Sequence, residues 1–361
     1  MLKPQPGIME LVPYVPGKSL VDGKPSVIKL SANESALGPS PKALEAFRGG
    51  DKSLHIYPDG SSKILREALG EFNTLDPERI VCGAGSDELL YNLARGYAGP
   101  GDEILMGEHG FNIYPIVAHC VGAKPVKVPE QNLTFDVDAT LSLVNDKTRI
   151  VFIANPNNPT GSYITSDELL KLRAALRDDI LLVIDCAYAE FVTRPDYNMG
   201  FDLVDGAENT VVTRTFSKIY ALAALRIGWC YCPPSIVDVL NRLRGPFNLS
   251  TPAQLAGKAA VEDVNHLRAA QEHNSIWLPW LSDRLTDCGL KVYPSVANFL
   301  LIQFGGSTGQ SAQEAMTFFA NKGILPRETS GYGLPDCLRV TIGRKNEMEE
   351  FVRVIKEFLA K

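Results

Sequence analysis

Four short segments of the chain carry residue types suited to catalysis, most of them at the end of an apolar stretch. Residues 155–161 form a turn in which two prolines and a glycine favour a rigid, exposed conformation. Asp185 ends an otherwise apolar run, and Tyr188 follows it by three residues. Residues 215–218 end another run, and Arg226 comes eight positions after the lysine of that segment. Because ligands of open α/β sheets bind at the carboxyl ends of the strands, we expect all four segments to face one crevice.

A glycine-containing turn before a predicted helix offers a binding place for one phosphate group. Gly83 and Gly85 follow a strand-like stretch, and the helical pattern opens at Ser86. The spacing is that of a dinucleotide-binding fingerprint, but Glu88 occupies the third glycine position, where a side chain impairs close packing and the approach of a pyrophosphate. A Walker A lysine and a nucleophile elbow are also absent from the sequence. What remains is the general capacity of a helix N-terminus to bind one phosphate.

The composition is that of a globular protein and excludes several functional classes. Of the 361 residues, 45% are hydrophobic and 22% are charged, and the formal net charge is −6. An acidic chain lacks the broad basic surface of a nucleic-acid binder, so an anionic ligand must be held by a few placed arginines. No apolar run reaches the length of a membrane span, and prolines replace the apolar core of a signal peptide at the N-terminus.

The spacing of the cysteines and histidines predicts reduced thiols and no metal site. The seven cysteines include no CxxC pair, and the five histidines show no HExxH motif. We therefore expect mostly buried thiols, a cytoplasmic location and no bound metal.

The first two thirds of the chain alternate short apolar runs with amphipathic stretches. Strands are expected at 79–82, 103–106, 149–154, 180–185, 210–214 and 226–232, and helices at 86–97, 166–176 and 234–244. The run 181–184 is apolar without alternation, as in a strand covered on both faces. This order predicts an α/β fold around a mostly parallel central sheet.

The pattern changes near residues 245–246, where a smaller α+β domain is expected to begin. The expected elements there are a helical stretch at 251–288 interrupted by Pro279, strands at 298–303 and 337–342, and helices at 310–321 and 345–360. The first forty residues are rich in proline and glycine and are expected to form an arm. The predicted division is therefore an arm at 1–40 that packs with the small domain or a partner subunit, a large domain at 41–245 and a small domain at 246–361.

The catalytic segments together resemble one enzyme family. The Asn-Pro-Asn-Asn-Pro-Thr-Gly turn, the strand-end aspartate followed by a tyrosine, and the motif SKxxxLAxxRxG that begins at Ser217 resemble the fold type I aminotransferases, which use pyridoxal phosphate. The order and spacing of these motifs extend over most of the chain. The resemblance implies a large cofactor-binding domain with a mostly parallel sheet and a smaller α+β domain.

The same resemblance implies catalytic roles for four side chains. Lys218 would form the Schiff base with the cofactor and later carry a proton, which requires a lysine that can be neutral. Asp185 would pair with the pyridine nitrogen and keep it protonated. Tyr188 and Asn158 would hydrogen-bond the phenolic oxygen of the cofactor.

The remaining cofactor contacts implied by the resemblance surround the phosphate group and the ring. A partner subunit would supply one of them, because Tyr57 matches a family position that reaches the cofactor phosphate of the other chain. The family is dimeric, so a homodimer with shared active sites is expected. The implied phosphate-binding and ring-stacking residues of the chain itself are Gly85, Ser86, Thr215, Ser217, Arg226 and Phe111.

Further segments resemble the histidinol-phosphate aminotransferases within that family. They are residues 13–18, 32–34, 37–41, 57–60 and 331–339, with a departure at Ser35-Ala36, where many members have Asn-Pro. The implied reaction transfers an amino group between L-histidinol phosphate and 2-oxoglutarate, giving imidazole-acetol phosphate and glutamate. The implied substrate-binding residues are Tyr14, Asn33, Asn158, Arg327 and Arg339.

Three other functions are compatible with the same motifs. An aromatic amino-acid aminotransferase acting on tyrosine or phenylalanine would use the same residues with a different pocket preference. A non-catalytic, aminotransferase-like binding protein is disfavoured because the lysine and its electronic partners are all present. A decarboxylase of the same fold is a weaker alternative. The motifs alone leave the substrate undecided.

Overall fold

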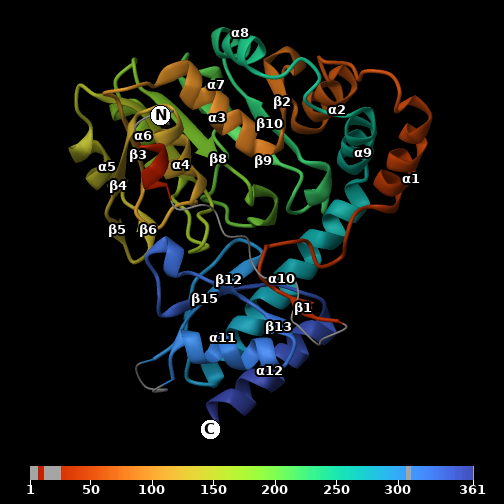
Figure 1. The fold of residues 1–361 in the computed structure, drawn as a ribbon, viewed down its shortest axis with the longest axis vertical. Coiled ribbons are helices and arrows are strands. Elements are labelled where there is room, and N and C mark those ends of the chain that lie inside the picture. The colour runs from red at the N-terminus through yellow and green to blue at the C-terminus, as the bar shows by residue number, and fades with distance from the viewer. Residues whose placement is uncertain (1–6, 12–25, 306–309, 361) are drawn as a thin grey trace, which may run out of the picture.

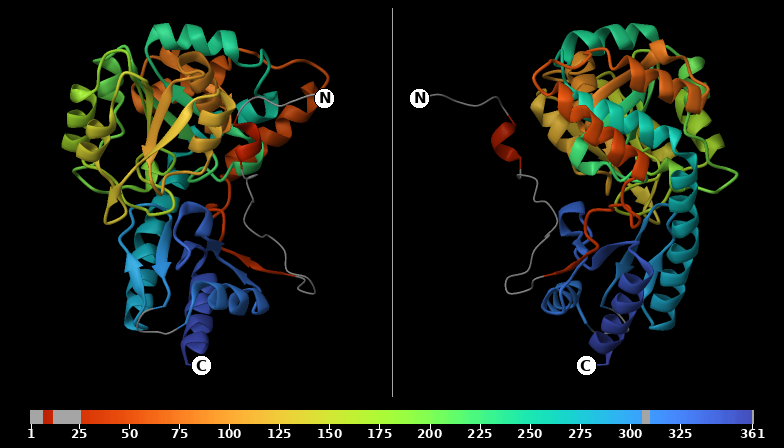
Figure 2. Two further views of the ribbon diagram at one scale, coloured as in Figure 1. Left: turned by 60° about the vertical axis from the view of Figure 1, so that its left-hand side comes forward. Right: turned by 90° about the vertical axis from the view of Figure 1, so that its right-hand side faces the viewer.

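The structure, a computed structural model, describes residues 7–11, 26–305 and 310–360. It has a larger body built on a seven-stranded sheet and a smaller body built on a four-stranded sheet (Figure 1). Helix α10 (Val264–Asp287) runs from one body to the other along one side of the molecule (Figure 2). Within the described ranges, no helix is both long and apolar enough to cross a lipid bilayer.

The sheet of the larger body is mostly parallel, as the sequence predicts. The strands β4, β3, β7, β8 and β9 are neighbours in that order and run parallel, whereas β10 is antiparallel to both of its neighbours, β9 and β2. The carboxyl ends of the parallel strands therefore meet at one edge of the sheet. The strands are β2 (Ile80–Ala84), β3 (Glu103–Gly107), β4 (Lys124–Val128), β7 (Thr148–Ala154), β8 (Leu181–Asp185), β9 (Thr210–Thr215) and β10 (Ile227–Tyr231).

Helices cover both faces of this sheet, which explains the unbroken apolar runs in its central strands. Alternate residues of β7 show the arrangement: Val151 and Ile153 join the core on one face, while Ile150 and Phe152 join the core on the other. The first face is covered by α2 (Lys63–Asn73), α5 (Val137–Leu143), α6 (Ser166–Ala175), α7 (Phe201–Asp205) and α9 (Thr251–Glu262). The second is covered by α3 (Gly85–Tyr97), α4 (Ile113–Cys120) and α8 (Pro234–Leu243).

The smaller body packs helices onto an antiparallel sheet with the order β11-β12-β15-β14. Its strands are β11 (Lys291–Tyr293), β12 (Phe299–Gln303), β14 (Arg327–Glu328) and β15 (Cys337–Thr341), and its helices are α11 (Ala312–Asn321) and α12 (Lys345–Leu359). The short strand β1 (Ile28–Lys29) pairs in parallel with β13 (Ile324–Leu325). This pairing ties the N-terminal segment to the smaller body.

The prediction of one helical stretch at 251–288 that is interrupted at Pro279 is wrong about where the helix is interrupted. Helix α9 ends at Glu262 and α10 begins at Val264, whereas Pro279 lies inside α10 without ending it. The break occurs at Asp263, whose carboxylate accepts a hydrogen bond of 2.5 Å from the Ser40 hydroxyl. A proline removes one backbone hydrogen bond of a helix, and here the packing of the following turns into the core of the smaller body maintains the helix.

The predicted division into 1–40, 41–245 and 246–361 stays a prediction. Helix α9 lies beyond residue 245 but packs on α2 and on α1 (Pro41–Gly49), so its buried alanines belong to the core of the larger body. The other predicted strands and helices are confirmed within one or two residues at each end.

The phenylalanine cluster of the smaller body should dominate its stability. Phe319 is fully buried, with its ring centroid 5.3 Å from that of Phe351. We expect Phe319→Ala to lower the free energy of unfolding by about 3–5 kcal/mol, because it leaves a cavity in a packed core. Urea denaturation followed by fluorescence should detect this loss, since Trp277 and Trp280 pack against the same core. The control Leu170→Ala, at a side chain that is 48% exposed, should change stability by less than about 0.5 kcal/mol; equal losses would contradict the assignment of the core.

Candidate active site

The residues predicted to carry chemistry meet at the carboxyl edge of the parallel strands. A cavity of about 280 Å³ opens there between the two bodies. Residues that follow β7, β8 and β9 line it, together with the N-terminal segment and strand β15. The predicted site residues in its lining are Asn33, Ser86, Phe111, Asn158, Asp185, Tyr188, Thr215, Ser217, Lys218, Arg226 and Arg339.

A larger cavity, of about 750 Å³, lies behind the 155–161 turn and contains none of the predicted site residues. Its walls include Thr160, Gly161 and residues of α10. The smaller cavity holds a lysine and a carboxyl group whose pKa values are both displaced from their ordinary ranges. Such displaced groups gathered in a cleft are typical of catalytic centres, so the smaller cavity is the candidate active site.

Asp185 is a buried carboxyl group held by two hydroxyls. Tyr114 donates a hydrogen bond of 2.9 Å to Oδ2, and Thr213 donates one of 3.2 Å to Oδ1. Burial raises the pKa of Asp185 to about 6, and the two hydroxyls oppose that rise because they stabilise the charged form. A cation placed in the cavity would complete the pairing of this carboxylate.

Lys218 lies in the cavity with its amine hydrogen-bonded to the protein backbone. Its Nζ donates to the carbonyl oxygen of Ala32 at 3.0 Å and lies 5.5 Å from the ring centroid of Tyr188. Burial, and next the positive charge of Arg339, lower the pKa of Lys218 to about 8. A substantial fraction of this amine is therefore neutral, and nucleophilic, near neutral pH.

Two polar side chains between Lys218 and the smaller body present hydrogen-bond donors to the cavity. The Tyr188 hydroxyl accepts a hydrogen bond of 2.9 Å from Asn33 Nδ2, so its own proton is available to a ligand. The Asn158 carbonyl oxygen accepts a hydrogen bond from Arg339, so its NH₂ group is available to a ligand. Two donors at this position suit an anionic oxygen.

The far end of the cavity is built to hold an anion. Gly85 begins α3 at a φ of +80°, and a side chain there would overlap the guanidinium of Arg226. Arg226 itself has a φ of +51° and donates to the Ser217 hydroxyl at 3.2 Å. The Thr215 hydroxyl accepts from the backbone N–H of Ser217 at 3.1 Å. A helix N-terminus, an arginine and hydroxyl groups together form a phosphate-binding arrangement.

The two arginines predicted to bind substrate lie on neighbouring strands. Arg327 on β14 is directly opposite Arg339 on β15, so their side chains leave the same face of the sheet. Arg339 is buried and donates to Asn158 and to the Ser31 carbonyl oxygen at 2.7 Å, while its Nε is buried without a hydrogen-bond partner among the described residues. Arg327 does not line the cavity in this arrangement.

Among the described residues, Gly85 and Tyr57 are, like Arg327, predicted site residues outside the cavity lining. Tyr14 lies outside the described residues. Tyr57 is 78% exposed, and its ring stacks on Phe247 at a centroid distance of 4.5 Å. A role for Tyr57 in the active site of its own chain is not supported by this placement.

Sequence reasoning missed three side chains that hold the site together. Tyr114 and Thr213 bind Asp185, and Asp87 forms an ion pair of 3.2 Å with Arg226. Two local sequence patterns could have identified Tyr114 and Thr213 as neighbours of the site. Tyr114 follows Phe111 by three residues at the start of a helix, and Thr213 precedes Thr215 by two residues on the same strand, so it leaves the same face.

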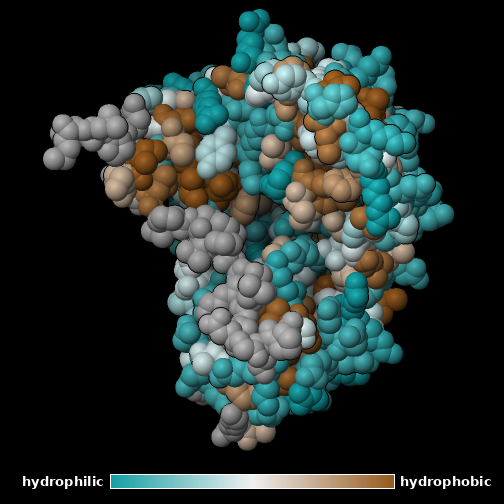
Figure 3. Space-filling model, turned by 45° about the vertical axis from the view of Figure 1, so that its right-hand side comes forward, coloured by the Kyte–Doolittle hydropathy of each residue, from teal (hydrophilic) through white to brown (hydrophobic). Residues whose placement is uncertain are grey.

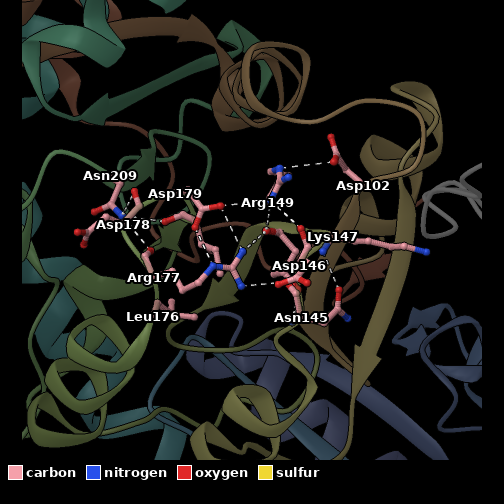
Figure 4. Close-up of polar contacts among 12 residues, drawn as sticks. Asp102, Asn145, Asp146, Lys147, Arg149, Leu176, Arg177, Asp178, Asp179 and Asn209 are labelled. Carbon is pink, nitrogen blue, oxygen red and sulfur yellow. Dashed lines mark hydrogen bonds and ion pairs between the residues drawn. The ribbon is translucent and has the colours of Figure 1, made fainter.

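The opposite edge of the sheet carries exposed ion pairs and no comparable cluster of buried groups among the described residues (Figure 4). Arg149, at the start of β7, lies 3.5 Å from Asp102 and 3.3 Å from Asp179. Arg177 donates to Asp179 at 2.8 Å and to the Asn145 carbonyl oxygen at 2.9 Å. Exposed pairs of this kind contribute little to stability, and they leave the carboxyl edge as the chemically distinct one.

The cavity fits pyridoxal phosphate, the cofactor implied by the resemblance. The side-chain-free position at Gly85 leaves room for an anion beside Arg226, and a carboxylate lacking a cationic partner lies at Asp185. An amine with a lowered pKa lies at Lys218. Phosphate, pyridine nitrogen and aldehyde each find a complementary group in one cavity.

The lowered pKa of Lys218 should be visible in its reactivity. With a pKa of about 8, half of the amine is neutral at pH 8, against roughly 0.3% for an ordinary lysine. We expect reductive methylation by formaldehyde and cyanoborohydride, followed by peptide mass spectrometry, to give a half-maximal rate near pH 8 for Lys218, well below the value for the free lysine derivative Nα-acetyl-lysine amide in the same reaction. Arg339→Ala should move the Lys218 value upward because it removes a neighbouring positive charge. A Lys218 profile identical to that of Nα-acetyl-lysine amide would contradict the assigned electrostatics.

Comparison with known proteins identifies the family of the chain. The profile of the family "Aminotransferase class I and II" matches residues 25–355. A histidinol-phosphate aminotransferase of Paramagnetospirillum magneticum is 53% identical over 99% of this chain and 98% of its own length. One of Rhodospirillum centenum is 50% identical over the same shares of both chains.

Solved structures share the fold. The histidinol-phosphate aminotransferase of Sinorhizobium meliloti, in complex with pyridoxal-5′-phosphate, superposes with a TM-score of 0.87 over 93% of this chain and 92% of its own, at 26% identity. The aspartate aminotransferase of Thermus thermophilus, at 21% identity, has a TM-score of 0.81 over 92% of this chain and 91% of its own and shows the fold alone. The chain has the fold type I architecture and belongs to the class I and II aminotransferases, within which it groups with the histidinol-phosphate aminotransferases.

Proposed function

We propose that the chain is a pyridoxal-phosphate-dependent transaminase that interconverts L-histidinol phosphate and 2-oxoglutarate with imidazole-acetol phosphate and L-glutamate, a reaction of histidine biosynthesis. The observation that carries the proposal is one cavity that joins Lys218, Asp185 and the anion-binding end at Arg226 to Arg339 of the smaller body. Full-length similarity of about half identity to histidinol-phosphate aminotransferases supports the choice of substrate.

Different residues of the cavity are proposed to bind the cofactor and to transfer the proton. Pyridoxal phosphate supplies an aldehyde that binds amines and an aromatic ring that withdraws electrons. Lys218 Nζ would hold the aldehyde carbon of the resting enzyme, and its amine, when free and neutral, would serve as the base for the proton on the amine-bearing carbon of the substrate. Asp185 would keep the pyridine nitrogen protonated, and Tyr188 and Asn158 would donate to the phenolic oxygen.

The phosphate of the cofactor would lie at the amino end of α3. Gly85 and Ser86 offer backbone N–H groups at a helix N-terminus, where the helix dipole favours an anion. Arg226 adds charge-assisted hydrogen bonds, with the hydroxyls of Thr215 and Ser217 beside it. Phe111 at the cavity wall is placed to stack on the ring.

The acid group of the substrate would bind the arginines of β14 and β15. Arg339 serves both half-reactions, since histidinol phosphate and 2-oxoglutarate each present an anion. Arg327, opposite Arg339 in register, favours the more highly charged phosphate ester. Asn33 contacts Tyr188 at the same wall, and Tyr14 is proposed as a further phosphate contact.

The active unit is proposed to be a homodimer with shared active sites. Large apolar side chains are exposed on α1 and the segment after it, including Leu44, Phe47, Leu54 and Ile56, and Figure 3 shows apolar surface on the side that carries α1. Tyr57 projects from this region and would reach the phosphate of the partner's cofactor. A cytoplasmic location is supported by the seven cysteines, all described and none in a disulfide.

An aromatic amino-acid aminotransferase remains the nearest alternative, because it would use the same cofactor residues. A donor panel separates the two, with histidinol phosphate, tyrosine, phenylalanine and histidine compared in the half-reaction that converts the enzyme-bound cofactor to its amine form. A wild type that prefers tyrosine or phenylalanine would make the aromatic activity the correct one. A protein that remains colourless with pyridoxal phosphate would favour the non-catalytic alternative.

The arginine pair predicts a substrate-selective defect. Arg327→Ala should lower kcat/KM for histidinol phosphate by roughly 10- to 100-fold, because a charge-assisted hydrogen bond is worth about 1.5–3 kcal/mol, and should leave phenylalanine within about threefold. Arg284→Ala, at an exposed arginine paired with Asp287, serves as the control and should change neither value. Equal losses for both donors would remove Arg327 from the phosphate site.

The proposed sharing of active sites predicts complementation between two defective subunits. In a heterodimer of Lys218→Ala and Tyr57→Ala chains, one site carries both defects and the other carries neither. Random subunit exchange should therefore restore about one working site in four. The measurement is the activity of the mixture after exchange, compared with each homodimer alone. Verified heterodimers without restored activity would show that Tyr57 does not act across the interface.

A further inference from the structure

Tyr114 is a buried tyrosine behind the cavity lining, and the proposed function gives its hydroxyl no role. It is 1% exposed, lies in the first turn of α4, and stacks on Phe152 of β7 at a centroid distance of 5.0 Å. Its hydroxyl donates to Asp185 Oδ2 at 2.9 Å. Phe111 lies two residues before α4, and its ring meets that of Tyr114 edge-on at a centroid distance of 5.8 Å.

Asp185 is thereby held at both oxygens by groups from different elements. Thr213 on β9 is directly opposite Asp185 of β8 in register and donates to Oδ1, whereas Tyr114 approaches Oδ2 from the helix side. With each oxygen engaged once, the plane of the carboxylate is defined. Its remaining lone pairs are left for a ligand in the cavity.

We propose that Tyr114 is a positioning residue for the cofactor-binding carboxylate: its hydroxyl, together with that of Thr213, keeps Asp185 ionised and oriented toward a protonated pyridine nitrogen. The inference rests on the proposed function, since it assigns the nitrogen of pyridoxal phosphate to Asp185. It adds a group outside the cavity lining that acts through the carboxylate, not by touching the cofactor.

Ring packing alone does not account for this hydroxyl. A phenylalanine would preserve the stack on Phe152, and burying a tyrosine hydroxyl is unfavourable unless it finds a partner. The other ionisable groups that face Asp185 are Asp87 from α3, Lys218 after β9, and Cys186 and Tyr188 after β8. Of these, only Lys218 brings a positive charge, and the proposed function occupies that amine with the cofactor aldehyde. The hydroxyls of Tyr114 and Thr213 are then the protein groups left to favour the charged carboxylate.

The test is the affinity of the cofactor-free protein for pyridoxal phosphate across pH 5.5–8.5, measured by equilibrium titration of absorbance and tryptophan fluorescence. Tyr114→Phe should weaken binding about tenfold or more at pH 7, because a hydrogen bond to a charged group is lost. It should also move upward, by about one unit, the pH below which affinity falls. The sign follows from the donor: without it the neutral carboxyl is favoured, so Asp185 takes up a proton at a higher pH.

Tyr231→Phe is the matched control. Tyr231 is also buried, and its hydroxyl donates to Asp205 at 2.7 Å near the end of β10 remote from the cavity. This variant loses the same kind of hydrogen bond and should bind pyridoxal phosphate as the wild type does, with the same pH profile. Near-ultraviolet circular dichroism of both cofactor-free variants checks that the fold is intact. If Tyr114→Phe fails to fold, Thr213→Val replaces it, because it removes the hydrogen bond to the other oxygen of Asp185 and should cause the same loss of affinity and the same pH shift.

A double variant distinguishes action through Asp185 from a general packing effect. In an Asp185→Asn background, Tyr114→Phe should cause no further loss of affinity, because no carboxylate remains to be held. A full additional loss there, or a Tyr114→Phe profile equal to that of Tyr231→Phe, would overturn the inference while leaving the proposed function standing. A wild type that fails to bind pyridoxal phosphate at all would overturn both.

Discussion

Burial of a carboxylate at the end of an apolar strand is the constraint around which the site is organised. Strand β8 is covered on both faces, so Asp185 leaves water together with the four apolar residues before it. An ionised group in such a place is tolerated only when hydrogen bonds and a countercharge compensate for the lost hydration. The hydroxyls of Tyr114 and Thr213 supply the hydrogen bonds. A ligand that brings a positive charge, such as the protonated ring nitrogen of the proposed cofactor, would complete this compensation.

The same burial sets the chemistry of Lys218. Its amine shares the cavity with Arg339, and desolvation and like charge act in the same direction on its pKa. Desolvation also raises the pKa of Asp185 to about 6, and the neighbours of each group decide how far its pKa moves. At a pH between about 6 and about 8 the carboxyl group is mostly ionised while a fraction of the amine is neutral, so one small cavity can hold both an anion and a nucleophilic amine.

The site is completed only where the two bodies meet. Arg339 comes from the smaller body, yet its guanidinium binds the Asn158 side chain of the larger body and the Ser31 carbonyl of the N-terminal segment. Ala32, one residue later, accepts the hydrogen bond of Lys218. A shift of the smaller body would therefore alter Arg339, Asn158 and Lys218 together. This linkage explains why the N-terminal segment, through the pairing of β1 with β13, is attached to the smaller body.

The sequence by itself determined the α/β class, the mostly parallel sheet and the meeting of the 155–161 turn, Asp185 and Lys218, because apolar periodicity is local and parallel strands must end at one edge. Only the tertiary structure decided which groups form hydrogen bonds with Asp185 and Lys218. The partners of Asp185 are hydroxyls 71 residues before and 28 after it, and the partner of Lys218 is a backbone carbonyl, which carries no sequence signal. The helix break at Asp263 is a similar case: its carboxylate binds the hydroxyl of Ser40, 223 residues away, whereas Pro279 lies inside α10 without ending it.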